Sequence, residues 1–285
     1  MNENKTNINW YPGHMAKTKR LISENLNFID VVYEVIDARI PISSKIVDID
    51  SYIKTKPRIL IMTKYDLCDK SETNKIIKYY ESKGYFVLTY DLEKNPSMKS
   101  LISATKKIME KANEKRINRG LKEKKIHALI VGVPNVGKST LINRLALKKV
   151  ANVGNKPGIT KNLNWIRVNS EIELLDTPGI LWPKLDNEIT AFNLAAFTAI
   201  KEEVLPIDEV VEYIIKKLYL LYPNILKEKY NVISIEEDFE KILEIIGKKR
   251  GCLIKGGLVD YDKVRMLVLN DIKQGSIKGI TFDRI

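Results

Sequence analysis

Residue types that can hold phosphate stand together in the run Gly132-Val133-Pro134-Asn135-Val136-Gly137-Lys138-Ser139-Thr140. The run matches the pattern G-x-x-x-x-G-K-[ST], and it lies between an apolar stretch and a segment of helical periodicity. The glycines let backbone N–H groups surround phosphate oxygens, and the start of a helix adds partial positive charge. We expect Lys138 to contact the β- and γ-phosphates of a nucleotide and Ser139 to bind Mg²⁺. A structural glycine turn is the alternative, which the strand-loop-helix context disfavours. The predicted nucleotide contacts of this loop are Asn135, Val136, Gly137, Lys138, Ser139 and Thr140.

Two downstream segments have the chemistry of a phosphate sensor. Asp176-Thr177-Pro178-Gly179 follows an apolar strand, so that Asp176 can hold the Mg²⁺ shell and the Gly179 N–H can reach the γ-phosphate. Between it and the phosphate loop lies Pro157-Gly158-Ile159-Thr160. The Thr160 hydroxyl can complete the Mg²⁺ shell only when a γ-phosphate is present, which is the physical basis of a switch. A plain Pro-Gly turn is the alternative. We predict Lys138 and Thr160 as catalytic residues, and Ser139, Thr160 and Asp176 as Mg²⁺ ligands.

A base-specificity motif of the type [NT]-K-x-D is found upstream of the phosphate loop. Thr63-Lys64-Tyr65-Asp66 directly follows the apolar strand Ile59–Met62. An Asp carboxylate there accepts both the N1–H and the N2–H₂ hydrogens of guanine, which adenine cannot supply. Downstream, the only near match is Pro183-Lys184-Leu185-Asp186, which begins with Pro and follows no strand. Thr63, Lys64 and Asp66 are therefore predicted to bind GTP. The contact to guanine O6, near Tyr90-Asp91-Leu92, is not assigned.

Strand and helix patterns alternate over residues 20–180. The predicted strands are Val31–Ile36, Ile59–Met62, Tyr85–Thr89, Ala128–Val131, Leu163–Val168 and Glu171–Leu175, and the predicted helices cover roughly 15–28, 72–82, 97–117 and 138–147. This alternation favours an α/β fold with a mainly parallel sheet covered on both faces. The short gap Asn169–Ser170 predicts a hairpin and one antiparallel edge.

Strand signals end near residue 185. Helical periodicity then appears at about 188–203, 207–222, 236–247 and 258–273. Because the base-specificity motif precedes the phosphate loop, we expect a circularly permuted P-loop G domain over residues 1–184, with an N-terminal helical extension at 1–27. A small all-helical domain is expected over 185–285.

The chain resembles the circularly permuted GTPases of ribosome assembly, of the ribosome biogenesis GTPase A type. The resemblance rests on four stretches: Trp10–Lys17 (WYPGHMAK), Asp37–Pro41 (DARIP), Asp176–Pro183 (DTPGILWP) and Lys249–Leu253 (KRGCL). It implies a bacterial, cytoplasmic GTPase that binds the immature large (50S) ribosomal subunit, contacts its rRNA and acts late in assembly.

No glutamine is available to orient the attacking water. The position after Asp176–Gly179 is Ile180, and the one Gln in the chain is Gln274. His14 can orient or deprotonate water, and the resemblance implies that role; a local cap or packing role is the alternative. Asn135 lies where related GTPases supply a K⁺ ligand, and a K⁺ there would act like an arginine finger, worth on the order of 10³–10⁵ in rate.

The formal net charge of +12 suggests a polyanionic partner. Residues 106–125 carry nine Lys or Arg against three Glu, and residues 138–161 carry six basic residues and no acid. We predict nucleic acid as the partner, with a solvated face as the alternative. Trp10 and Tyr11 could stack on bases or pack against the core. The predicted phosphate contacts are Arg39, Lys17, Lys19, Arg20, Lys248, Lys249, Arg250 and Lys255.

Three functions remain open at this point. The first is a GTPase switch for large-subunit assembly. The second is a nucleotide-gated RNA-binding scaffold without useful turnover, and the third is a P-loop ATPase or kinase, against which Asp66 argues. We expect a monomer with reduced cysteines and no membrane span, because no apolar run approaches about 18 residues.

Overall fold

The computed structural model describes residues 20–47, 49–53, 56–121, 124–151, 164–179, 187–197, 206–236 and 238–285. Within these ranges six strands form one sheet in the order β3-β2-β1-β4-β6-β5. The strands are β1 (Val31–Asp37), β2 (Arg58–Thr63), β3 (Phe86–Thr89), β4 (Ile126–Val131), β5 (Asn164–Arg167) and β6 (Ile172–Asp176). Neighbouring strands are parallel except β5 and β6, which are antiparallel. The predicted α/β class and its antiparallel edge are confirmed.

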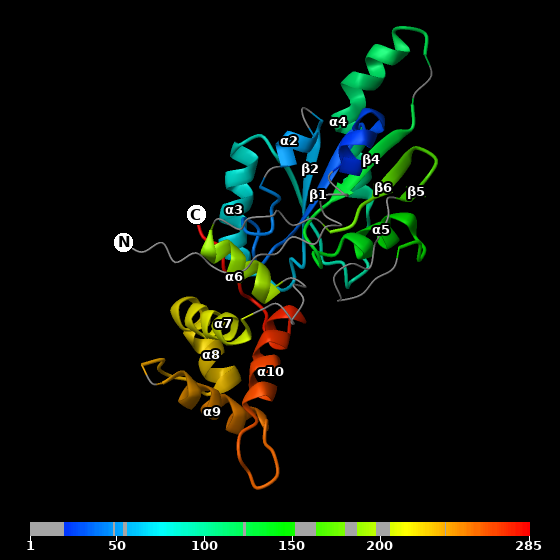
Figure 1. Ribbon diagram of the computed structural model, residues 1–285. Coiled ribbons are helices and arrows are strands. Elements are labelled where there is room, and N and C mark those ends of the chain that lie inside the picture. The colour runs from blue at the N-terminus through cyan, green and yellow to red at the C-terminus, as the bar shows by residue number, and fades with distance from the viewer. Residues whose placement is uncertain are drawn as a thin grey trace.

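Helices cover the sheet on both faces (Figure 1). Leu60 and Met62 of β2 pack in one apolar cluster with Ile76 of α3, while Ile59 and Ile61 belong to the larger cluster that α4 and α5 also enter. Both faces of the sheet are therefore covered by apolar clusters. Every residue of β1 is buried, as expected for a central parallel strand. The elements are η1 (Leu26–Phe28), α2 (Ile49–Ile53), α3 (Lys70–Ser82), α4 (Lys99–Ile117) and α5 (Lys138–Ala146), and residues 20–25 are also helical.

The second half of the described chain is helical. It contains α6 (Glu188–Phe197), α7 (Ile207–Leu221), α8 (Pro223–Tyr230), α9 (Phe239–Arg250) and α10 (Tyr261–Lys273). Helix α8 was not predicted. It begins at Pro223, and proline suits the first position of a helix, where its missing N–H costs nothing. No helix in the described ranges combines the length and hydrophobicity needed to cross a bilayer.

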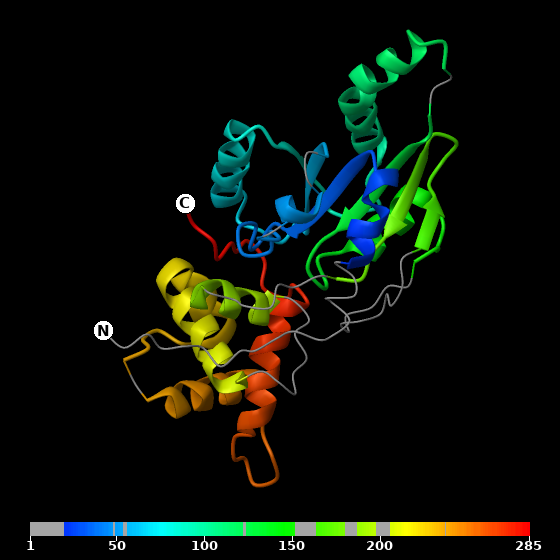
Figure 2. The same cartoon turned by 45° about the horizontal axis from the view of Figure 1, so that its top comes forward.

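The C-terminal segment, residues 277–285, returns from α10 to the α/β part of the chain (Figure 2). The Asp283 carboxylate accepts hydrogen bonds from the backbone N–H of Ile42 at 2.7 Å and of Ser43 at 2.8 Å, and from the Ser43 hydroxyl at 2.6 Å. Asn193 of α6 donates to the same carboxylate at 2.9 Å. Asp283 is buried, so this carboxylate joins three separate segments out of contact with water.

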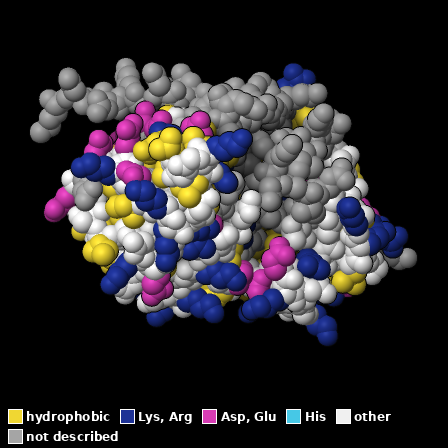
Figure 3. Space-filling view, turned by 90° about the horizontal axis from the view of Figure 1, so that it is seen from below, with side chains coloured by type: hydrophobic (Ala, Val, Ile, Leu, Met, Phe, Trp, Pro, Cys, Tyr) yellow, Lys and Arg dark blue, Asp and Glu magenta, His cyan; other side chains and the backbone are white. Residues whose placement is uncertain are grey.

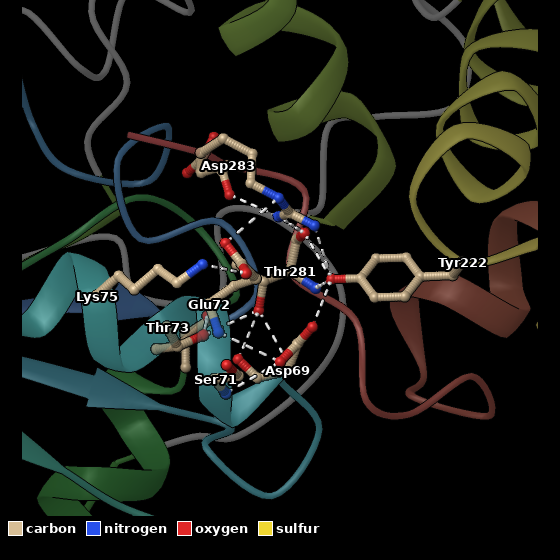
Figure 4. Close-up of polar contacts among 10 residues, drawn as sticks. Asp69, Ser71, Glu72, Thr73, Lys75, Tyr222, Thr281 and Asp283 are labelled. Carbon is tan, nitrogen blue, oxygen red and sulfur yellow. Dashed lines mark hydrogen bonds and ion pairs between the residues drawn. The ribbon is translucent and has the colours of Figure 1, made fainter.

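A second set of polar contacts fastens the C-terminal segment to α3 (Figure 4). Asp69 caps the N-terminus of α3, accepting from the backbone N–H of Ser71 and Glu72. The Tyr222 hydroxyl lies 3.2 Å from the second carboxylate oxygen of Asp69 and accepts from the backbone N–H of Thr281 at 2.9 Å. The Thr281 hydroxyl in turn lies 2.9 Å from that of Thr73. The last residues of the chain therefore pack against the segment that follows β2.

Candidate nucleotide site

The loop between β4 and α5 has the backbone conformation that its glycines allow. Gly137 has φ of 94° and stands directly before the first residue of α5. Gly132 passes so close to β1 that a Cβ atom would lie 2.4 Å from the carbonyl oxygen of Val35. Asn135 has φ of 60°, a left-handed conformation that asparagine tolerates. The chain therefore turns tightly at the end of β4 and presents the unpaired N–H groups of the first turn of α5 to an anion.

Lys138, the first residue of α5, is buried with its ammonium group turned onto this loop. Nζ donates to the carbonyl oxygens of Gly132 at 3.0 Å and Val133 at 2.9 Å. Burial lowers the pKa of Lys138 to about 8, and the negative charge of Asp176 offsets part of that effect. A desolvated ammonium held by weak neutral acceptors is well suited to exchange them for phosphate oxygens.

Asp176, the last residue of β6, has a carboxylate oxygen that lacks a partner. Oδ1 is buried and accepts no hydrogen bond from the residues that the structure describes. Burial raises the pKa of Asp176 to about 6, and the charge of Lys138 offsets part of that effect. A buried, unsatisfied carboxylate oxygen is costly unless a cation or water completes it. The Asp176 carboxylate, the Ser139 hydroxyl and phosphate oxygens are the type of oxygen donors that Mg²⁺ prefers.

The segment after β6 lies directly against the phosphate loop. A Cβ atom on Gly179 would stand 2.9 Å from both the Cα and the N atom of Pro134, so only glycine fits there. The hydroxyl of Thr177 donates to the carbonyl oxygen of Ile130 at 2.7 Å, which fixes the segment to β4. The structure thus brings together two of the predicted phosphate-binding segments.

The predicted base-specificity motif also contacts the phosphate loop. The Thr63 hydroxyl donates to the carbonyl oxygen of Val136 at 2.5 Å. The Lys64 ammonium donates to the carbonyl oxygen of Asn135 at 2.9 Å, and Lys64 itself has φ of 57°. We call residues 63–69 the specificity loop. Because both of its first side chains bond to the phosphate loop, the two loops are held in a fixed relation to each other.

Asp66 lies next to a second carboxylate. Burial and the nearby charge of Asp91 both raise the pKa of Asp66. Asp91 belongs to the loop after β3, where Arg144 of α5 donates to the carbonyl oxygen of Leu92 at 3.1 Å. A second negative charge nearby disfavours the ionised form of a carboxylate, and hydrogen bonds from N–H donors, such as those on the edge of guanine, stabilise that form. No local sequence pattern pointed to Arg144, because its partner lies far away in the chain.

The prediction that Arg39 contacts RNA is wrong. Arg39 is 0% exposed, and its guanidinium makes a bidentate pair with Asp37, with Nε 3.0 Å from Oδ1 and Nη2 2.8 Å from Oδ2. Its third nitrogen, Nη1, donates to the carbonyl oxygen of Ile272 in α10 at 2.6 Å. Lys64 donates to the same Asp37 carboxylate at 3.0 Å. Asp37 and Arg39 therefore form a buried polar cluster that joins the specificity loop to α10.

Other predicted RNA contacts have different environments. Arg20, Lys248 and Arg250 each pair with a nearby acid, Glu24, Glu244 and Asp271 respectively. Lys249 and Lys255 are exposed.

Several predicted functional residues lie outside the described residues. They are Trp10, Tyr11, His14, Lys17, Lys19 and Thr160; Ile180 and the rejected near match Pro183–Asp186 lie there too.

A phosphate loop, an adjoining carboxylate and a base-specificity loop on a mainly parallel sheet define a P-loop GTPase. Residues 127–249 match the family model described as "50S ribosome-binding GTPase". Ribosome biogenesis GTPase A of Priestia megaterium is 46% identical over 277 residues, covering 97% of this chain and 96% of that protein. The protein of the same name from Thermotoga maritima is 32% identical, covering 97% of this chain and 94% of that protein. The chain therefore belongs to the ribosome biogenesis GTPase A family, and it is a GTP hydrolase.

A solved structure shares this architecture. The crystal structure of GNP-bound YlqF from T. maritima superimposes with a TM-score of 0.66 at 27% identity, covering 94% of this chain and 98% of that one.

Proposed function

We propose that this GTPase binds the immature large (50S) ribosomal subunit in the bacterial cytoplasm, acts as a monomer late in assembly, and is activated by the subunit it binds. The observation that carries the proposal is similarity over 97% of the chain to proteins named ribosome biogenesis GTPase A, together with a "50S ribosome-binding GTPase" match. The formal net charge of +12 supports rRNA as the contact surface.

Guanine recognition is proposed for Thr63, Lys64 and Asp66. The position of the Thr63 and Lys64 side chains against the phosphate loop supports it, because a nucleotide spans both loops. Replacement of Asp66 by Asn should lower GTP affinity and raise the relative affinity for xanthosine triphosphate, whose C2 carbonyl accepts from an amide. Unchanged preference for GTP would remove Asp66 from this role.

Phosphate and metal binding are proposed for the loop and its neighbours. Lys138 would hold the β- and γ-phosphates, and Ser139, Thr160 and Asp176 would hold Mg²⁺. Bound Mg²⁺ neutralises charge that develops on the phosphates during hydrolysis. The remaining proposed nucleotide contacts are Asn135, Val136, Gly137, Thr140 and Gly179.

Water positioning is proposed for His14, and K⁺ binding for Asn135. No Gln follows Gly179, and the one Gln in the chain, Gln274, caps the C-terminus of α10. This supports orientation of the attacking water by a group other than Gln. Replacing K⁺ by Na⁺ at fixed ionic strength should slow hydrolysis if Asn135 holds K⁺. Full subunit-stimulated turnover by a His14→Ala protein would exclude His14.

Domain roles follow the expected division of the chain. We assign GTP hydrolysis to residues 1–184, with an N-terminal extension at 1–27, and rRNA contact in part to the helical residues 185–285. The two parts are in contact at two places. Asp283 of the segment 277–285 bonds to Ile42 and Ser43, and Asn193 of α6 bonds to the Ser43 hydroxyl.

The test is GTP hydrolysis by the purified protein in K⁺ buffer, with and without large ribosomal subunits. Slow turnover alone and a large rise with subunits support the proposal. GTP binding with negligible turnover in both conditions would favour the scaffold function instead.

A further inference from the structure

Helix α4 is longer than the sheet that it covers. Leu101, Thr105 and Met109 follow one another along its buried face, but Ala112, the next residue on that face, is exposed. Beyond Met109 the described side chains up to residue 121 are exposed, with only Asn113 half-buried. Figures 1 and 2 both show this end of α4 and the turn after it extending away from the sheet. We call residues 107–121 the arm.

Four basic residues recur along one side of the arm. Lys107, Lys111 and Lys115 are spaced by four on α4, so their side chains follow one another at about 6 Å of helix rise per step, and Arg119 follows in the turn after the helix ends at Ile117. All four are exposed, and none forms an ion pair with a residue that the structure describes.

The basic residues at the base of the arm differ from these four in being paired. Lys106 contacts Glu171 at 2.8 Å, Lys124 contacts Asp30 at 3.2 Å, and Lys125 contacts Glu173 at 2.7 Å. Glu110 and Glu114 also lie on the arm, three residues after Lys107 and Lys111, but neither pairs with a basic residue that the structure describes. The row of four lies where the sheet no longer provides partners.

Stability does not explain the arm. Like charges at i and i+4 repel each other and weaken a helix. The dipole of α4 favours a cation such as Arg119 at its C-terminal end but does nothing for Lys107 in its middle. Ile117 and Leu121 are each 50% exposed, so the extension buries little apolar surface in return. A helix end that projects, carries more basic than acidic residues and buries little apolar surface is better explained by binding to something else.

We infer that the arm binds the phosphate backbone of double-stranded RNA. Evenly spaced cations on a rigid helix match the evenly spaced phosphates of a duplex strand. Residues 99–121 contain no aromatic side chain, so the arm lacks the stacking surface that single-stranded RNA binding uses. Duplex RNA is recognised chiefly through its shape and phosphates. The inference rests on the proposed function, because a ribosomal subunit supplies such duplexes.

The helical part of the chain presents a different surface. Figure 3 shows Lys and Arg side chains on the face seen from below interspersed with Asp, Glu and apolar ones. Lys216 pairs with Glu212 at 2.6 Å and Arg250 with Asp271 at 2.6 Å on this part of the chain. Among the residues that the structure describes, the arm therefore carries four successive basic side chains, spaced by four, with no acidic partner.

The test compares two variants that each lose four positive charges. The arm variant replaces the row by glutamine: Lys107→Gln, Lys111→Gln, Lys115→Gln and Arg119→Gln. The control variant removes four exposed lysines of the α/β part that also form no ion pair with a described residue: Lys70→Gln, Lys78→Gln, Lys83→Gln and Lys99→Gln. Both should keep wild-type GTP hydrolysis in the absence of subunits, which reports that the fold and the nucleotide site are intact.

Binding is measured with a fluorescent RNA duplex, with one of its single strands, and with purified large subunits, each over a range of salt concentration. The wild type should prefer the duplex to the single strand. Each lost phosphate contact lowers the salt slope by about 0.7–0.9, so the arm variant should lose about 3 from the slope. Between 50 and 200 mM salt, wild-type affinity for the duplex should then fall about 50- to 150-fold more than that of the arm variant. The control variant should keep most of the wild-type slope.

An equal loss in both variants, or wild-type duplex binding by the arm variant, would overturn the inference. The titration with large subunits distinguishes failure of this inference from failure of the proposed function. If the wild type binds the duplex through the arm but does not bind subunits, the proposed function fails and the arm remains an RNA-binding element. If the arm variant binds both subunits and duplex as the wild type does, the function stands and the arm is excluded.

Discussion

Replacing Asp37 by Asn tests how the nucleotide site is joined to the rest of the fold. Asp37 is fully buried, and its carboxylate accepts from Arg39 at 2.8 and 3.0 Å and from Lys64 at 3.0 Å. Burial alone would raise the pKa of Asp37, but the positive charges of Arg39 and Lys64 hold that pKa well below its usual range. One carboxylate thus balances one fully buried cation, Arg39, and one partly buried cation, Lys64.

The structure predicts the order of two substitutions. Asp37→Asn keeps the shape but leaves the buried guanidinium of Arg39 and the partly buried ammonium of Lys64 without their shared counter-charge, which should cost about 4–5 kcal/mol of unfolding free energy. Arg39→Met keeps much of the apolar volume and leaves Asp37 paired with Lys64, so about 3 kcal/mol is expected. The total stability of a protein is only about 5–15 kcal/mol, so either loss is large. The double variant should cost less than the sum by about 2 kcal/mol, because both changes remove the same pair.

The assay is urea unfolding of the wild type and the three variants, followed by circular dichroism. The pH dependence has a defined sign. Because the folded pKa of Asp37 lies below its unfolded value of about 3.9, its stabilising contribution is complete above that value and is lost as the pH falls toward the folded pKa. The stability difference between wild type and Asp37→Asn should therefore be constant near neutral pH and shrink in acid. A larger cost for Arg39→Met than for Asp37→Asn, or fully additive effects, would refute the charge-balance reasoning.

Three further substitutions follow from the site. Gly132→Ala would place its Cβ atom 2.4 Å from the Val35 carbonyl oxygen, so nucleotide binding should be lost or the protein should fail to fold, as measured by calorimetry and circular dichroism. Thr63→Val keeps the shape but leaves the Val136 carbonyl oxygen unsatisfied, which should cost about 1–3 kcal/mol of stability and weaken GDP binding; unchanged affinity would contradict the role of Thr63. Asp283→Asn removes the charge that four donors share and should lower the unfolding free energy by about 2–3 kcal/mol in urea; a neutral result would show that the C-terminal segment docks without it.

Local patterns in the sequence were sufficient for most of the sheet. Each predicted strand is present with ends shifted by one or two residues, because apolar runs flanked by turn residues specify buried strands directly. The spacing of the phosphate loop predicted its strand-loop-helix context, since that motif is itself local.

The same reasoning could not predict contacts between residues that are far apart in the chain. Arg39 was expected at the surface, because a lone arginine in a loop is usually solvated. Its burial depends on Ile272, which lies 233 residues further along the chain. The basic run 106–125 was predicted to contact nucleic acid, but the projection of the arm was not predicted, because no sequence pattern shows where the sheet beneath the helix ends.

The specificity loop is the segment on which the separate parts of the protein converge. At its start, Lys64 bonds to the phosphate loop and to Asp37. At its end, the Leu67 carbonyl oxygen accepts from the backbone N–H of Gly279 at 2.8 Å, and the Asp69 N–H donates to the Thr281 hydroxyl at 3.1 Å. A rearrangement of the phosphate loop on nucleotide binding must therefore strain contacts that also hold the C-terminal segment in place. If a partner binds that segment and thereby changes nucleotide affinity, linkage requires the nucleotide to change the affinity of that partner by the same factor.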